Sequence, residues 1–191
     1  MTIQEKIIYS VQDAIRATEQ LITPHAVDFM TEVAQALTQA FMSGNKVIIA
    51  GNGGSLCDAS HFAEELTGFF RNYRAALPAI ALSEPGHITC VGNDIGFEWV
   101  FSRGVEAYGK PGDIFVGLTT SGNSINLVNA FETAKRLGLT TVAFLGKEGV
   151  KIKGMSEYEL IIEGFKTSDR IQEAHMVAIH TIIEITEHLI E

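Results

Sequence analysis

The stretch VIIAGNGGSLCDASHFAEEL, residues 47–66, decides the fold. Its first four residues are apolar and partly β-branched, which predicts a short strand buried on both faces, as in a parallel sheet. Three glycines in the next four residues allow a sharp turn and a close approach of the backbone to a ligand. Ser55 is then a suitable N-cap for a helix that runs to Leu66. This strand–turn–helix unit predicts an α/β protein.

The same stretch carries groups that can do chemistry. A helix that starts after a glycine loop offers free N–H groups to an anion. His61 and Glu65 stand four residues apart, so a helix places them on one face, where they could move protons or hold a metal. The alternative is a plain tight turn followed by a solvated pair of little energetic worth. Similar features recur later in the chain, and the combination favours a functional site.

Composition limits the classes of partner. The chain has 191 residues, of which 46% are hydrophobic and 19% charged, enough for one sizeable domain. No linker or repeat is evident, so we expect a single domain over residues 1–191. The net charge of −9 argues against nucleic acid or an anionic membrane as the main partner. An anionic substrate would therefore need local donors such as backbone N–H groups and hydroxyls.

The N-terminal region has charges throughout and no apolar signal core. No apolar run approaches the roughly 20 residues of a membrane span. The two cysteines, Cys57 and Cys90, have neither metal-type nor disulfide-type spacing. These features predict a cytoplasmic protein.

Two helices are expected before the first strand. Apolar residues follow a helical period from Ile3 to Leu21, and Thr23-Pro24 restarts a helix that ends near Gly44. The apolar stripes of this N-terminal extension, about residues 1–44, must pack somewhere. They either cover their own domain or form a subunit interface, and we expect oligomerisation.

The rest of the chain alternates between strands and helices. This alternation predicts a doubly wound, mostly parallel five-stranded sheet flanked by helices. Besides the strand at 47–50, the expected strands are 79–82, 113–118, 141–145 and 159–162, and the expected helices are 55–68, 86–93, 97–108, 123–137 and 168–189.

A second loop of the same kind follows the strand at 113–118. It reads TTSGNS, residues 119–124, with four hydroxyls, a glycine and the start of another helix. Ligands of such sheets bind beyond the carboxyl ends of the strands, so this loop and the loop at 51–55 should share one rim. The hydroxyls favour phosphate binding over an ordinary Ser/Thr-rich turn with a capping serine.

The last helix adds polar groups to an apolar sequence. Gln172 and His180 are eight residues apart and can share a wide face of the helix. With His61 and Glu65 they would form a mixed nitrogen and oxygen set suited to zinc, although glutamine is an uncommon ligand. A histidine in this position is otherwise a structural one.

Five segments together resemble the sugar isomerase (SIS) domain family. They are GNGGS, HFAEELTG, CVGNDIGF, TSGNS and DRIQEAHMVAIH, and the resemblance covers nearly the whole chain. It is closest to the members that act on a seven-carbon sugar phosphate in bacterial surface-heptose (lipopolysaccharide) synthesis.

This resemblance implies a homotetrameric isomerase that converts sedoheptulose 7-phosphate to D-glycero-D-manno-heptose 7-phosphate through an enediol(ate). The implied proton-transfer pair is Glu65 and His180. The implied zinc ligands are His61, Glu65, Gln172 and His180. The implied substrate-binding positions are Asn52, Gly53, Gly54, Ser55, Glu65, Asn93, Asp94, Thr119, Thr120, Ser121, Ser124, Asp169 and Gln172.

One position departs from the family pattern. Members often carry an arginine after HFAEELTG, where this chain has Phe69, and Arg71 or Arg74 are the candidates to replace it. Two other functions stay open: an adaptor that binds the bacterial replication initiator, and another sugar-phosphate isomerase or sensor. The presence of Glu65 and His180 favours an enzyme over an adaptor.

Overall fold

The computed structural model describes residues 1–149 and 151–190, so positions 150 and 191 of the expected domain lie outside it. A five-stranded sheet with the order β2-β1-β3-β4-β5 forms its centre, and every pair of neighbouring strands is parallel. The sheet confirms the predicted doubly wound α/β class. Its strands are β1 (Val47–Gly51), β2 (Ala79–Ala81), β3 (Ile114–Thr119), β4 (Thr140–Gly146) and β5 (Tyr158–Ile162).

The central strand β1 shows why its sequence is a continuous apolar run. Val47 and Ile49 face one hydrophobic core, and Ile48 and Ala50 face the other. All four are completely buried, because helices cover both faces of the sheet. The run therefore carries the signature of a doubly covered strand rather than of a strand with one wet face.

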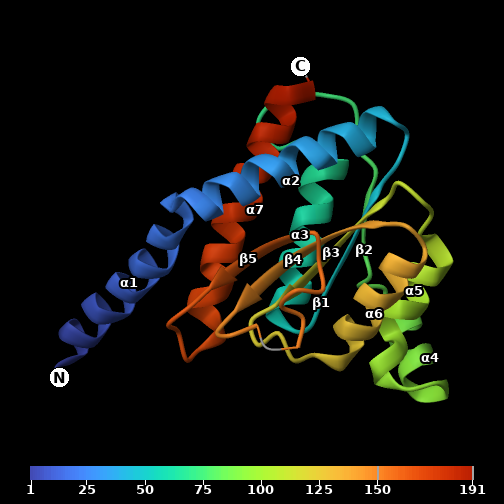
Figure 1. The fold of residues 1–191 in the computed structure, drawn as a ribbon. Helices are drawn as coiled ribbons and strands as arrows, with labels where there is room; N and C mark the ends of the chain where they lie inside the picture. The colour runs from blue at the N-terminus through green and yellow to red at the C-terminus, as the bar shows by residue number, and fades with distance from the viewer. Residues whose placement is uncertain (150, 191) are drawn as a thin grey trace.

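The helices form two layers (Figure 1). On one face lie α2 (Pro24–Met42), α3 (Gly54–Thr67) and α7 (Ser168–Ile190). On the other lie α4 (Pro85–Asp94), α5 (Val100–Tyr108) and α6 (Ile125–Arg136). Short 3-10 turns lie at Gln20–Ile22 and Phe97–Trp99.

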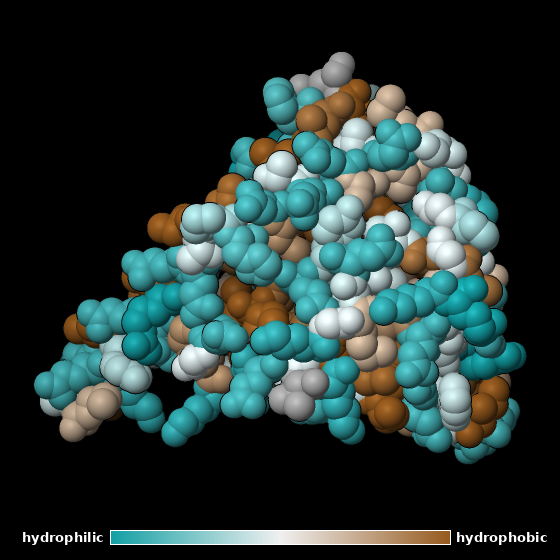
Figure 2. All heavy atoms as spheres, in the orientation of Figure 1, coloured by the Kyte–Doolittle hydropathy of each residue, from teal (hydrophilic) through white to brown (hydrophobic). Residues whose placement is uncertain are grey.

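The first helix, α1 (Ile3–Glu19), extends from the body as an arm (Figure 1). A capping box between Thr2 and Glu5 starts it, and Ala17 is the one buried residue within it. Ile3 is 77% exposed and Ile7 is 58% exposed, and Figure 2 shows hydrophobic side chains along this arm. The single chain thus leaves most of the predicted α1 stripe uncovered.

The order of the strands predicts where a ligand would bind. The strand order changes direction between β1 and β3, whose following helices α3 and α6 cover opposite faces. Loops that part in this way open a crevice at the carboxyl ends of the strands.

None of the helices in the described residues is long and apolar enough to cross a membrane.

Candidate active site

The loop after β1 builds the first wall of the crevice. Gly53 has a φ of +57°, in the left-handed region that favours glycine, and it is the N-cap of α3. The predicted N-cap at Ser55 is therefore wrong: the helix starts at Gly54, because Leu56 N–H and Cys57 N–H already donate to the Gly53 carbonyl. The Ser55 hydroxyl instead accepts a hydrogen bond from Gln172 Nε2 at 3.2 Å.

A cavity of about 370 Å³ lies where the N-terminal ends of α3, α6 and α7 converge. Its wall is mostly hydroxyl, amide and glycine backbone, and none of the described residues that line it is basic. Free N–H groups at helix starts suit an anion without a lysine or arginine. The lining residues are Asn52, Gly54, Ser55, Leu118, Thr119, Thr120, Ser121, Ser124, Ser168 and Gln172.

Side-chain hydrogen bonds hold the walls of this cavity together. Asn52 and Asn126 exchange two amide hydrogen bonds of 3.0 and 2.9 Å, which join the loop after β1 to α6. Thr120 Oγ1 donates to Ser168 Oγ at 2.9 Å and joins the loop after β3 to α7. Ser124 is the N-cap of α6, yet its side chain makes no capping hydrogen bond, so its hydroxyl is available to a ligand.

Gly54 is required by close packing. A Cβ atom there would lie 2.6 Å from Gln172 Nε2 and 2.9 Å from its Oε1. The absence of a side chain lets α7 approach the start of α3, and Gln172 fills the space between them.

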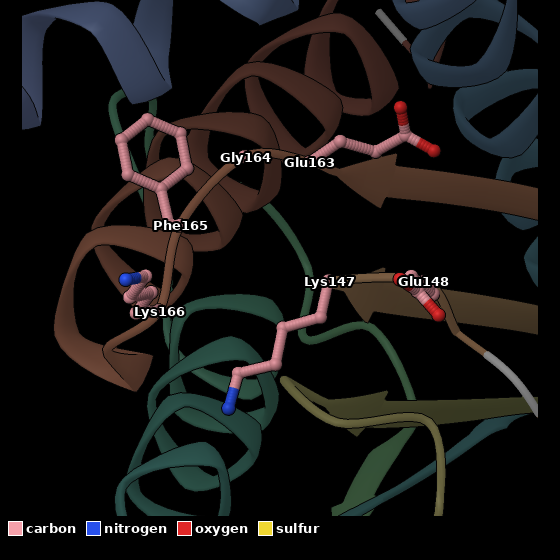
Figure 3. Close-up of a pocket in the computed structure, with 6 residues that line it drawn as sticks. All are labelled: Lys147, Glu148, Glu163, Gly164, Phe165 and Lys166. Carbon is pink, nitrogen blue, oxygen red and sulfur yellow. The ribbon is translucent and has the colours of Figure 1, made fainter.

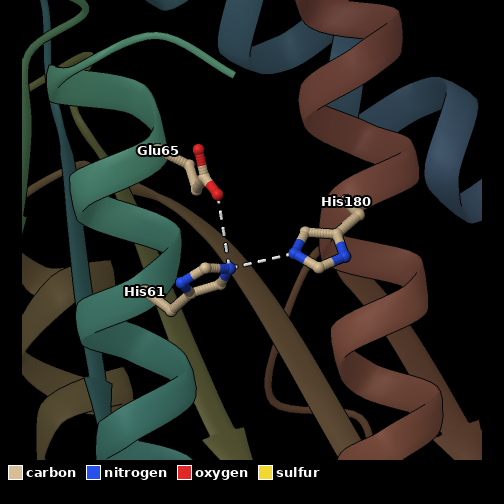
Figure 4. Close-up of side chains that lie close together, drawn as sticks. All are labelled: His61, Glu65 and His180. Carbon is tan, nitrogen blue, oxygen red and sulfur yellow. Dashed lines mark hydrogen bonds and ion pairs between the residues drawn. The ribbon is translucent and has the colours of Figure 1, made fainter. Parts of the chain in front are cut away.

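A second group of polar side chains lies further along α3 and α7 (Figure 4). His61 Nε2 lies 3.0 Å from His180 Nε2 and 3.4 Å from Glu65 Oε1. The three residues together offer ligand atoms within 4.8 Å of one another, a geometry that can hold a metal ion. The other ring nitrogen of His61, Nδ1, lies 2.9 Å from Glu64 Oε1, which orients the imidazole. We call His61, Glu65 and His180 the imidazole–carboxylate cluster.

Burial shifts the pKa values of His180 and Asp58. Burial, with help from the charges of His61 and Arg71, lowers the pKa of His180 below its usual value against the opposing effect of Glu65. One turn before His61, burial raises the pKa of Asp58 to about 6, and one of its oxygens, Oδ2, is buried without a hydrogen-bond partner. Asp58 therefore prefers to be protonated more than an ordinary aspartic acid does.

Most of the predicted substrate-binding residues meet in one place. Eight of them line the cavity: Asn52, Gly54, Ser55, Thr119, Thr120, Ser121, Ser124 and Gln172. Within one chain the cavity lining does not include the other five, which are Gly53, Glu65, Asn93, Asp94 and Asp169. Asn93 and Asp94 are exposed and bond to each other at the end of α4, and Asp169 pairs with Arg170.

Three polar residues of this region were not among those predicted from the sequence. Ser168 lines the cavity, Asn126 supports Asn52, and Asp58 lies between the cavity and the cluster along α3. A signal existed for Ser168, since a serine directly before the DRIQ segment starts the last helix. Asn126 and Asp58 carry no local signal, because their importance depends on partners that are remote in sequence.

Two other polar groups have structural roles. His175 is fully buried and its Nε2 lies 2.9 Å from the Leu145 carbonyl, and burial lowers its pKa to about 4. Arg74 forms a buried ion pair with Glu187, so it is not available to replace the missing arginine at Phe69. Phe69 itself is exposed and its ring contacts Tyr73.

A larger hollow of about 550 Å³ lies beyond the carboxyl ends of β4 and β5 (Figure 3). Lys147 and Lys166 contribute its cations, and Glu148 and Glu163 its anions. Figure 3 shows the acidic groups pointing away from the lysine ends. Charges of both signs that do not converge on one point make it a weaker candidate than the hydroxyl-lined cavity.

The sequence and the fold agree with known proteins. The SIS domain family matches residues 11–146, more than half of the chain, and defines the class as a SIS domain protein. The phosphoheptose isomerase of Fusobacterium nucleatum is 61% identical over 158 residues, which cover 83% of this chain and 81% of that protein. The phosphoheptose isomerase of Glaesserella parasuis is 45% identical over 185 residues, 96% of each chain.

A solved structure shows the same agreement in three dimensions. The phosphoheptose isomerase from Neisseria gonorrhoeae has a TM-score of 0.90 and 35% identity, over 98% of this chain and 100% of that one. The chain belongs to the phosphoheptose isomerase family of SIS domain proteins, which are sugar-phosphate isomerases.

Proposed function

We propose that this chain isomerises sedoheptulose 7-phosphate to D-glycero-D-manno-heptose 7-phosphate in bacterial heptose biosynthesis. The observation that carries the proposal is the placement of the cavity and the imidazole–carboxylate cluster along the same two helices. His61 lies six residues after Ser55, which is about 9 Å along the helix axis. A sugar phosphate can place its phosphate in the cavity and its carbonyl carbons at the cluster.

The proposed reaction is a proton transfer next to a carbonyl. Removal of a proton from C1 of the ketose gives an enediol(ate), and delivery of a proton to C2 gives the aldose. Glu65 acts as the base at carbon, and His180 moves protons at the oxygens, with the exchange of these two roles as the alternative. The lowered pKa of His180 supports this role, because a neutral imidazole can first accept a proton at neutral pH and then donate it.

Zinc is the metal that the cluster would suit. Two imidazole nitrogens and one carboxylate oxygen are typical zinc ligands, and His61, Glu65 and His180 present them close together. Gln172, the fourth ligand that the resemblance implies, donates through Nε2 to the Ser55 hydroxyl in this structure. When bound, zinc would supply Lewis-acid chemistry at a substrate oxygen, and Glu65 and His180 act in proton transfer only while they are not its ligands. Zinc titration of the chelated protein should show one site per chain, and its loss in His61→Ala would support these ligands.

We also propose a homotetramer in which neighbouring chains complete each site. The exposed apolar face of α1 supports an interface, and Asn93, Asp94 and Asp169 lie outside the cavity of their own chain. Sedimentation should give the mass of four chains, and deletion of residues 1–22 should cause dissociation and loss of turnover together. An active monomer would contradict this assembly.

We also propose that the enzyme is cytoplasmic. Cys57 and Cys90 are both free and exposed, which suits a reducing cytoplasm.

The relatives named above are phosphoheptose isomerases and give no support to an adaptor that binds the replication initiator.

The decisive experiment is turnover of a panel of ketose and aldose phosphates in deuterated water. We expect a preference for sedoheptulose 7-phosphate and incorporation of solvent deuterium at C2 of the aldose. Preference for a shorter sugar phosphate would refute the substrate, and a fully retained hydrogen label would refute the enediol(ate) route.

A further inference from the structure

The segment that follows α3 is fastened to α7 by a buried carboxylate. Glu187 is 3% exposed, and its two oxygens accept hydrogen bonds from Phe70 N–H at 3.0 Å and Arg71 N–H at 3.1 Å. Burial opposes ionisation of Glu187, but these donors and Arg74 outweigh it and lower its pKa. A carboxylate held in this way fixes the backbone at Phe70 against the end of α7.

Arg74 extends this attachment to α3. Its Nε donates to Glu187 Oε1 at 2.8 Å, and its two terminal nitrogens donate to the carbonyls of Leu66 and Glu65 at 2.9 Å each. The arginine thereby satisfies carbonyl groups of the last turn of α3, the turn that bears Glu65. The Glu187–Arg74 pair joins the helix of Glu65 to the helix of His180.

Phe70, which this attachment holds in place, touches the imidazole–carboxylate cluster. Its ring stacks on the ring of His180, with 5.4 Å between centroids and 23° between planes. The ring of His61 meets His180 edge-on, at 5.2 Å and 74°. The guanidinium of Arg71 lies 5.4 Å from the Phe70 ring centroid. The imidazole of His180 is therefore restrained by one ring along its face and by another at its edge.

We propose that Phe70 is a positioning residue for His180, anchored by the Glu187–Arg74 pair, and this inference rests on the proposed function. The torsion that turns a histidine ring has a broad energy profile, so the ring needs external contacts to hold one orientation. Phe70 restricts that rotation and keeps Nε2 of His180 directed toward His61. Proton transfer depends on such alignment, because a small misplacement of a catalytic group lowers its rate strongly.

The test compares three variants of the full chain. Phe70→Leu retains an apolar side chain but removes the stacked ring, and we expect kcat to fall about tenfold while KM changes less than about twofold. Phe70→Tyr keeps the ring and should retain wild-type kcat. Tyr73→Leu is the matched control, since it removes an aromatic ring from the same segment at a position that is 92% exposed. Equal activity of Phe70→Leu and Tyr73→Leu would overturn the proposal.

A spectroscopic measurement separates this inference from the proposed function and from simple unfolding. In the wild-type protein, ring current from Phe70 should move the His180 ring protons upfield in the NMR spectrum. Phe70→Leu should abolish that displacement, and Phe70→Tyr should preserve it. The same His180 spectrum in wild type and Phe70→Leu would overturn the stacking role even if no substrate is turned over. Absence of turnover by the wild type, with the NMR effect present, would instead refute the proposed function.

Discussion

The hydroxyl-lined cavity and the imidazole–carboxylate cluster occupy the same two helices but are built differently. The cavity uses backbone N–H groups, hydroxyls and amides contributed at helix starts. The cluster uses side chains from the middle of α3 and α7, and His61 contacts His180 across 119 residues of sequence. The first arrangement suits binding of a fixed charge, and the second suits movement of protons.

The two regions are also held together by different contacts. The cavity is reinforced by hydrogen bonds between its own walls, such as those between Asn52 and Asn126. The cluster depends on the spacing of α3 and α7, which the Glu187–Arg74 pair and the Gly54–Gln172 contact help to set. Substitutions in the two regions should therefore separate affinity from rate.

The largest effect is expected at Glu65. Glu65→Gln keeps the size and hydrogen bonding of the side chain but removes the base, so kcat should fall by about 10²- to 10⁴-fold. Affinity for the sugar phosphate, measured by calorimetry, should change little because the cavity is intact. Glu132→Gln, an exposed position on α6, is the control. Near wild-type turnover in Glu65→Gln would assign the carbon base to another group.

A smaller effect, of the opposite kind, is expected at Ser124. Its hydroxyl lines the cavity but makes no helix-capping bond, so Ser124→Ala should leave the melting temperature nearly unchanged. Loss of one hydrogen bond to a charged group should weaken binding of inorganic phosphate and sugar phosphate by about 10- to 100-fold. Turnover will fall as well where phosphate binding positions the reacting carbons. Unchanged phosphate affinity would remove Ser124 from the site.

The smallest effect is expected at Asp58, between the two regions. Its pKa is raised to about 6, so the folded state retains a proton that the unfolded chain releases near pH 4. The stability associated with this proton is complete below about pH 4 and is lost as the pH rises through about 6. Asp58→Asn has no carboxyl group to titrate, so its stability does not fall in this pH range. Above pH 6 its free energy of unfolding should exceed that of the wild type by at most about 1 kcal/mol, since the side chain is partly solvated.

Thermal unfolding of chelated wild type and Asp58→Asn between pH 4 and pH 8 would measure this difference. The two melting temperatures should converge at low pH and separate above pH 6. A constant separation at every pH would mean that Asp58 has an ordinary pKa.

Much of the site could be predicted because its signals are local. The glycines at 51–54 and the hydroxyls at 119–124 lie in short segments that follow buried strands, and both segments line the cavity. The sequence predicts the N-cap of α3 at Ser55, two residues after the actual N-cap, because a capping rule that favours serine does not recognise Gly53 with its positive φ. Phe70 offered no signal, because a phenylalanine beside an exposed loop has the same sequence context as any surface aromatic.

By itself, the sequence determined the doubly wound sheet and the anion-binding loops, since hydrophobic period, glycine turns and helix starts act between near neighbours. Tertiary structure alone decided the pairing of α3 with α7. That pairing places Gln172 against Ser55, stacks Phe70 on His180 and leaves Asp58 half-buried. These contacts depend on how closely two helices approach across more than a hundred residues, which is set by the packing of the whole core rather than by any local pattern.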